Sequence, residues 1–114
     1  MNITLALNPN IHFDPIIFGG GFGYFRVALL LTASGGLYPD GSPSIVPPYT
    51  MVTIKRNDTG ATISASYIGA DMTFVMVAAN AGLPQSSVPI HAEVSGGPNG
   101  ANTGTSNDLS VDFS

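Results

Sequence analysis

Apolar and polar residues alternate most regularly over residues 49–79, where the sequence predicts three strands joined by two turns. Side chains on a strand point alternately to its two faces, so Val52 and Ile54 share one face with Thr50. Residues 56–60 are rich in the types that form turns, including a glycine and an asparagine that tolerate positive φ. The chain is therefore predicted to reverse there as an antiparallel hairpin.

The other two strands of this segment are predicted over residues 61–67 and 72–78. In the first, Ile63, Ala65 and Tyr67 alternate with hydroxyl side chains, which predicts that these three face the core. The second carries apolar residues on both faces, a pattern typical of a strand that is covered on two sides. We therefore expect it to lie centrally in its sheet.

Further segments with the same period of two lie outside this region. They cover residues 3–7, 24–33, 88–95 and 109–113. The segment 24–33 is the longest and is predicted to be a central strand. Within 88–95, Pro89 lacks a backbone N–H, which favours an edge position for that strand.

This order of elements predicts an all-β protein. About seven or eight short strands, broken by Gly, Pro, Asn and Asp, favour an antiparallel β-sandwich of the jelly-roll type. An immunoglobulin-like sandwich without a disulfide is the alternative, since the chain has no cysteine. The 114 residues are expected to form a single domain over 1–114.

Two long segments have no apolar period. Residues 34–48 are loop by composition, with a turn predicted at Pro39, Asp40 and Gly41, and long loops in a small domain often carry function. A connection that crosses between two sheets is the other reading of this segment. Residues 96–107 consist mainly of Gly, Asn and Thr, so we expect them to be mobile or ordered only by a partner.

Charged residues make up only 9% of the chain, against about 25% in a typical domain, while 44% of residues are hydrophobic. The longest apolar run, around residues 27–31, is far shorter than the roughly 20 residues of a membrane-spanning helix, so no membrane span is predicted. Three basic residues and a net charge of −4 argue against binding to nucleic acid or to anionic membranes.

The first residues lack the basic, apolar and small-residue regions of a signal peptide. The sequence therefore predicts synthesis in the cytosol without a signal peptide, with a virion or an assembled surface structure as the expected location.

No motif points to catalysis or to a cofactor. The glycines at 19–23 are not followed by the Lys-Ser or Lys-Thr of a phosphate loop. His12 and Asp14 would point to the same side of a strand, but two ligands do not make a metal site, and His91 joins them only if the fold brings it near. Ser64 and Ser66 have no partners that would mark a nucleophile. The chain is therefore predicted not to be an enzyme, with no metal and no cofactor.

A calcium site is the remaining metal hypothesis. Its oxygen ligands would come from Asp58, Asp71, Asp108 and Asp112, with Asn57 and Asn107. These residues lack the dense spacing of a known calcium loop and are also ordinary turn residues, so a role in turns is the default interpretation.

Low charge, surplus apolar content and uncharged loops favour a non-enzymatic structural or assembly protein. A phage capsid decoration or tail protein and an appendage subunit are examples, acting as a homo-oligomer or within a larger protein assembly. The aromatic residues proposed for the interface are Phe18, Phe22, Tyr24 and Phe25. The alternative is a carbohydrate-binding or adhesion module, in which a glycan would contact Tyr38, Asp40, Tyr49, Asn57 and Asp58.

Overall fold

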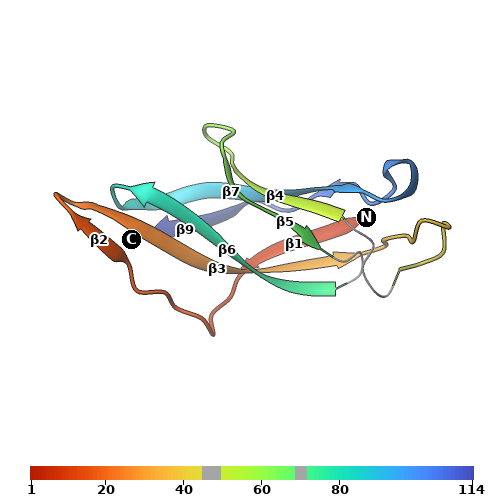
Figure 1. The fold of residues 1–114 in the computed structure, drawn as a ribbon, viewed down its shortest axis with the longest axis horizontal. Coiled ribbons are helices and arrows are strands. Elements are labelled where there is room, and N and C mark those ends of the chain that lie inside the picture. Colours follow the sequence, from red (N-terminus) through yellow and green to blue (C-terminus); the bar gives the residue numbers. More distant parts are fainter. Residues whose placement is uncertain (45–49, 69–71) are drawn as a thin grey trace.

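The computed structural model describes residues 1–44, 50–68 and 72–114, and shows two antiparallel sheets packed face to face (Figure 1). The strands are β1 (Asn2–Leu7), β2 (Ile16–Gly19), β3 (Phe22–Ser34), β4 (Thr50–Arg56), β5 (Thr62–Ile68), β6 (Met72–Gly82), β7 (Gln85–Gly96), β8 (Gly104–Thr105) and β9 (Leu109–Phe113), with one 3-10 turn, η1 (Pro98–Gly100). The predicted all-β antiparallel sandwich is confirmed. None of the described residues belongs to a helix of the length and hydrophobicity needed to cross a bilayer.

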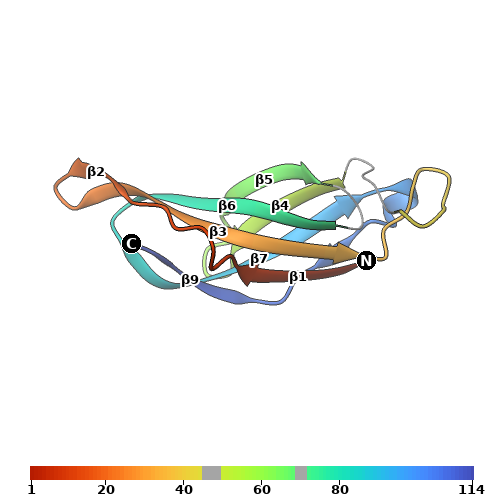
Figure 2. The ribbon, with the colours of Figure 1, turned by 90° about the horizontal axis from the view of Figure 1, so that it is seen from below.

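The first sheet is built around β3. This strand pairs with β1 and β2 along one edge and with β6 along the other, all in antiparallel register. The prediction that the longest apolar segment forms a central strand is therefore confirmed. The β2–β3 hairpin extends beyond the rest of the sandwich at one end of the 53 Å long axis (Figures 1 and 2).

The second sheet has the order β5, β4, β7, and β7 continues to β8 and β9 on its far edge. In Figure 2 the strands of the two sheets run roughly along the same direction, with β5 and β6 on one side of the sandwich and β9 on the other. The chain passes from one sheet to the other between β3 and β4, between β5 and β6, and between β6 and β7.

The core lies between the sheets and follows the period of two in the sequence. It consists of one cluster that includes Ile3, Leu5, Phe25, Leu29, Leu31, Val52, Ile54, Met76, Val88, Ile90, Ala92, Val94, Val111 and Phe113. Burying apolar side chains on one face of each strand stabilises the sandwich at about 25 cal/mol per Å² of area removed from water.

The prediction that residues 72–78 form a central strand is wrong. Within the described part of the chain β6 pairs only with β3, so it is an edge strand. Its outward side chains Val75 and Val77 are 59% and 39% exposed. The apolar residues on both faces of β6 therefore indicate that its outer face is an exposed apolar surface. They do not indicate a strand that is covered on two sides.

The predicted inward face of β5 is confirmed for Ile63, which packs against the core, but is wrong for Ala65 and Tyr67. A register shift between Ile54 and Lys55 sets Ile54 opposite Ser64, which places Ala65 and Tyr67 on the outer face of the sheet. Tyr67 is 64% exposed as a result. A slip of one residue reverses every side chain of a strand, and this bulge could not be read from the alternation alone.

β7 is a central strand, so the edge position inferred from Pro89 is wrong. It pairs with β4 on one side and with β9 on the other. Pro89 lies just beyond the last β4 pair, where its carbonyl accepts a hydrogen bond from the N–H of Asn57 at 2.8 Å. The missing N–H therefore interrupts no bond of the β4–β7 ladder.

The segment 96–107 is ordered by contacts within the chain, which corrects the expectation that it needs a partner. The side chain of Asn102 is fully buried, accepts a hydrogen bond from the N–H of Leu37 at 2.7 Å and donates to its carbonyl at 3.1 Å. The turn at residues 39–41 is confirmed, since the N–H of Gly41 donates to the carbonyl of Tyr38 at 2.8 Å. Residues 45–48 of the predicted 34–48 loop lie outside the described residues.

Candidate functional site

Five large apolar side chains are exposed together at the projecting end of the molecule. We call this group the apolar tip; its members are Ile16, Ile17, Phe18, Phe22 and Leu83. Their exposed fractions lie between 48% and 66%. All four residues of β2 are exposed, and the strand pairs only with the start of β3 among the described residues. The tip therefore places apolar side chains in solvent on a hairpin that the core does not cover.

Glycines shape the tip. Gly19, Gly20 and Gly21 all have positive φ, which a residue with a Cβ adopts only with strain, and they form the tight turn between β2 and β3. At Gly23 an added Cβ would lie 2.9 Å from the carbonyl oxygen of Ile16 and 2.9 Å from the ring of Phe25. β2 therefore packs closely over β3, and the hairpin is anchored to the core through Phe25.

Leu83 joins the tip from a distant part of the sequence. It follows β6, which ends beside the start of β3, and a Cβ on Gly21 would lie 3.5 Å from its side chain. The turn between β6 and β7 thereby adds an apolar side chain to the surface of the β2–β3 hairpin.

The outer face of the first sheet, next to the tip, carries almost no charge. Its outward side chains include Ala6, Leu30, Val75, Val77, Ala79 and Ala81. Among the described strands of this sheet Arg26 is the only charged residue; its guanidinium lies 4.7 Å from the ring centre of Phe13 and donates to the carbonyl of Asp14 at 3.3 Å. An apolar surface of this kind is typical of a contact with another protein.

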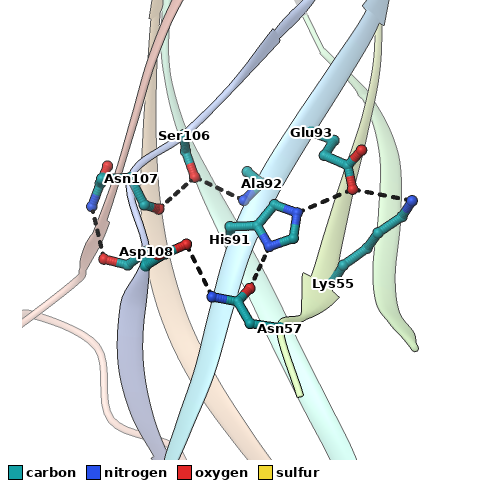
Figure 3. A network of polar contacts seen from close by, with 8 residues as sticks. All are labelled: Lys55, Asn57, His91, Ala92, Glu93, Ser106, Asn107 and Asp108. Atoms are coloured by element: carbon teal, nitrogen blue, oxygen red, sulfur yellow. Dashed lines mark hydrogen bonds and ion pairs between the residues drawn. The ribbon is translucent and has the colours of Figure 1, made fainter. Parts of the chain in front are cut away.

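A polar cluster occupies the outer face of the second sheet (Figure 3). Glu93 accepts from Lys55 at 3.1 Å, and its Oε2 atom also lies 3.1 Å from Nε2 of His91. Nδ1 of His91 donates to the side-chain oxygen of Asn57, whose amide nitrogen donates to Asp108 at 2.9 Å. These contacts connect the end of β4, the middle of β7 and the segment that leads into β9.

The charged groups of this cluster neutralise one another. They line a shallow hollow of about 430 Å³ together with Arg56, Gly60 and Thr105. Within the described ranges no three His, Cys, Asp or Glu side chains are grouped so that they could hold a metal ion. The contacts of the cluster connect β4 and β7 to the segment that leads into β9.

The hydrogen bonds of the cluster make the stability of the fold depend on pH. Donation from Lys55, and then from His91, holds the pKa of Glu93 below its usual value. Because the folded state favours the carboxylate, this stabilisation is present at neutral pH, above the unfolded pKa, and is lost as the pH falls through the lower folded pKa.

We expect the variant Glu93→Gln to reduce the difference in unfolding free energy between about pH 6 and pH 3, because glutamine does not titrate. Urea denaturation of both proteins at the two pH values measures this difference. An identical pH dependence in the two proteins would show that the Glu93 contacts do not contribute.

The other predicted acids are held by contacts within the chain. Asp58 forms a two-pronged ion pair with Arg56, at 2.9 and 2.7 Å, and this pair lowers the pKa of Asp58. Asp112 accepts from the N–H of Ser87 at 2.8 Å, and Asn107 bonds to both backbone groups of Leu5. Asp71 lies outside the described residues. The structure thus gives Asp58, Asp112 and Asn107 roles in turns and strand edges.

The pair His12 and Asp14 is exposed, with 3.7 Å between Nε2 and the carboxylate. His12 lines a second hollow beside Leu7 and Arg26, whereas His91 lines the hollow of the polar cluster. The fold therefore does not bring His91 to this pair.

The four described residues among those proposed to contact a glycan are not gathered in one place. Tyr38 and Asp40 lie in the loop held by Asn102 beside Thr50, at the start of β4, whereas Asn57 and Asp58 follow its end. Asp40 accepts from the N–H and hydroxyl of Ser42, which lowers its pKa. Tyr49 lies outside the described residues. Carbohydrate binding stays a prediction.

The predicted interface aromatics divide between surface and core. Phe18 and Phe22 belong to the apolar tip, and Tyr24 is half-buried beside Arg26. Phe25 is only 3% exposed and packs in the core, so its place among the surface residues is corrected. The sequence reading missed Ile16, Ile17 and Leu83; the first two were visible as an apolar run before the glycines, but Leu83 reaches the tip only through the fold.

Comparison with protein-family models, with curated protein sequences and with solved structures finds no match to this chain, so the assignment of function depends on the surfaces described above.

Proposed function

We propose that the chain is a non-enzymatic structural subunit that binds another protein through its apolar tip. The observation that supports this is the exposure of Ile17, Phe18 and Phe22 on one hairpin at the end of the long axis. Exposed apolar groups that cluster in this way are characteristic of protein contact sites, where Phe is enriched and charge is depleted.

The mechanism is docking of a preformed apolar surface. The glycine turn and the anchor at Phe25 hold the tip in place before a partner binds, so little conformational entropy is lost on binding. Removing the exposed Phe and Ile surface from water then supplies the favourable part of the binding free energy, from which the lost translational and rotational freedom is subtracted. Virion decoration proteins, tail proteins and appendage subunits bind their neighbours in this way. We propose that the chain belongs to one of these classes of structural protein.

Photo-crosslinking from position 18 tests this proposal. A benzoylphenylalanine in place of Phe18, in cells that make the chain naturally, should form an adduct with a second protein. The same group at Thr59, an exposed residue of the β4–β5 turn, is the matched control and should form none. Adducts formed only with lipid or glycan would contradict the proposal.

Loss of the tip side chains should release the chain from its assembly. The double variant Phe18→Ser, Phe22→Ser should move from a large particle to the free pool on size fractionation, while Ile11→Ser, a change at another exposed apolar residue, should not. Circular dichroism confirms that both variants fold. A wild-type chain that fractionates only as a free monomer would overturn the proposal.

A further inference from the structure

β6 is an edge strand whose free side is open to another strand. It pairs with β3 through eleven consecutive residue pairs, from Gly23 opposite Gly82 to Ala33 opposite Met72, without a register shift. Within the described part of the chain it has no other strand partner. In an antiparallel pair alternate residues direct N–H and C=O groups away from the neighbour, so those of β6 point outward from the sheet.

Most of the usual protections of a free edge are missing from β6, although β5 of the second sheet lies beside it. Natural sheets protect an edge with charged residues, proline, a bulge, a very short strand or a covering segment. β6 reads MTFVMVAANAG, with no charged residue and no proline, and it is eleven residues long. Its outward side chains at Val75 and Val77 are exposed and apolar. Such an edge is a template for strand pairing.

The other outer strands of the two sheets each carry a protection. The edge of β1 is covered by Asn107, whose side chain accepts from the N–H of Leu5 at 2.8 Å and donates to its carbonyl at 2.9 Å. β2 and β8 are only four and two residues long. The ladders of β5 and β9 are interrupted by register shifts. Among the described strands β6 is therefore the exception.

We propose that β6 pairs with β6 of a second copy of this chain around a two-fold axis, joining the two first sheets into one continuous sheet. This inference rests on the proposed function, because it names a second copy of the chain as one partner in the assembly. The evidence for it comes from β6, a surface different from the apolar tip. Most soluble oligomers are closed and symmetric, and a two-fold contact uses the same patch on both copies.

The absence of acidic residues favours this edge as the contact between two copies. With a net charge of −4, two copies repel each other wherever their acidic groups meet. Neither β6 nor β3 contains an acidic residue, and Arg26 on β3 is occupied by Phe13 and the carbonyl of Asp14. Two copies can therefore approach along β6 without placing like charges opposite each other.

β6 can also pair with a second β6 so that small and apolar residues face each other. The antiparallel register that pairs all eleven residues sets Val77 opposite its own symmetry mate, Val75 opposite Ala79, and Thr73 opposite Ala81. At about 3.4 Å per residue the paired strands are roughly 35 Å long, and the joined edge is one sheet layer, about 10 Å, deep. The resulting contact of roughly 350 Å² per copy is smaller than the roughly 800 Å² of a standard interface, so a weak dimer is expected.

A single cysteine tests the position of the two-fold axis directly. The chain has no cysteine, so Val77→Cys introduces one thiol per copy. Residues opposite each other on antiparallel strands have Cα atoms about 4.5–5.5 Å apart, within the range for a disulfide. Mild oxidation should give a covalent dimer of Val77→Cys. The control Ser110→Cys, on an exposed outward residue of β9, should stay monomeric under the same conditions.

Sedimentation equilibrium of the pure chain gives the second readout. The wild type should dimerise, and Val77→Lys, which puts two ammonium groups side by side at the axis, should weaken the dimer by at least about tenfold. Ser110→Lys makes the same change in net charge on the opposite side of the sandwich and should have no effect. A monomer at all concentrations, a dimer indifferent to Val77→Lys, or equal crosslinking of both cysteine variants would overturn the inference. The two proposals can fail separately. If the pure chain is a monomer but the double variant Phe18→Ser, Phe22→Ser still leaves its assembly, the β6 contact is disproved and the proposed function stands.

Discussion

Replacing Phe113 by alanine should lower the free energy of unfolding by about 3–5 kcal/mol, the range measured for large aromatic side chains in cores. Phe113 is completely buried, and its strand β9 pairs with β7 at the edge of the second sheet. Alanine would leave a cavity between the sheets that neighbouring residues fill only in part. Because a domain of this size has a total stability of about 5–15 kcal/mol, the change removes a large share of it.

Urea denaturation measures this loss, and thermal unfolding should show a fall in Tm of roughly 10–20 °C. The matched control is Phe18→Ala, the same change at a side chain of the apolar tip that is 66% exposed, which should alter stability by less than about 0.5 kcal/mol. Similar losses in the two variants would show that Phe113 is not buried as described.

Replacing Asn102 by alanine should cost about 2–3 kcal/mol, because it leaves buried polar groups without partners. The Asn102 side chain satisfies both backbone groups of Leu37 and donates to the hydroxyl of Thr50 at 3.3 Å. It also packs under Gly97, where an added Cβ would lie 2.6 Å from the Asn102 side-chain carbon. This one amide therefore connects the segment after β7 to the loop before β4.

Hydrogen exchange separates a local effect from general destabilisation. In Asn102→Ala the amide of Leu37 should lose protection more than the amides of the β3–β6 ladder, since its acceptor is gone. Asn10→Ala, at an exposed asparagine, is the control and should change neither stability nor exchange at Leu37. Uniform loss of protection across the chain would contradict the local role of Asn102.

Strands that are covered on one face could be predicted from the sequence residue by residue. In β7 the alternation placed Val88, Ile90 and Val94 inward, and all three are buried. The same holds for Val52 and Ile54 in β4. Apolar side chains on such a strand have one low-energy environment, between the sheets. The period of two in the sequence therefore shows which residues face the core.

The errors occurred where pairing between strands decides the outcome. The bulge opposite Lys55 turned Tyr67 outward, and the apolar outer face of β6 was taken for burial because sequence alone does not show which edge stays unpaired. Pro89 was misjudged because β4 ends just before it could pair there. Each error concerns a neighbour that is distant in the sequence.

The candidate sites follow the same division. Phe18 and Phe22 were recognised as contact residues beside the glycine run, whereas Leu83 reaches the apolar tip only because β6 ends against the start of β3. The polar cluster of Lys55, His91 and Glu93 was not predicted, since its members come from two strands whose register is set by the folded sheet.

The amino-acid sequence by itself determined the class of fold, the positions of most strands and the low charge of the surface, because these depend on local alternation and composition. Only the tertiary structure decided which edge is left open, which apolar residues gather at the tip and which polar side chains meet. Those properties depend on the pairing of strands far apart in the chain, and such pairing is selected by the free energy of the whole sandwich and by no single segment.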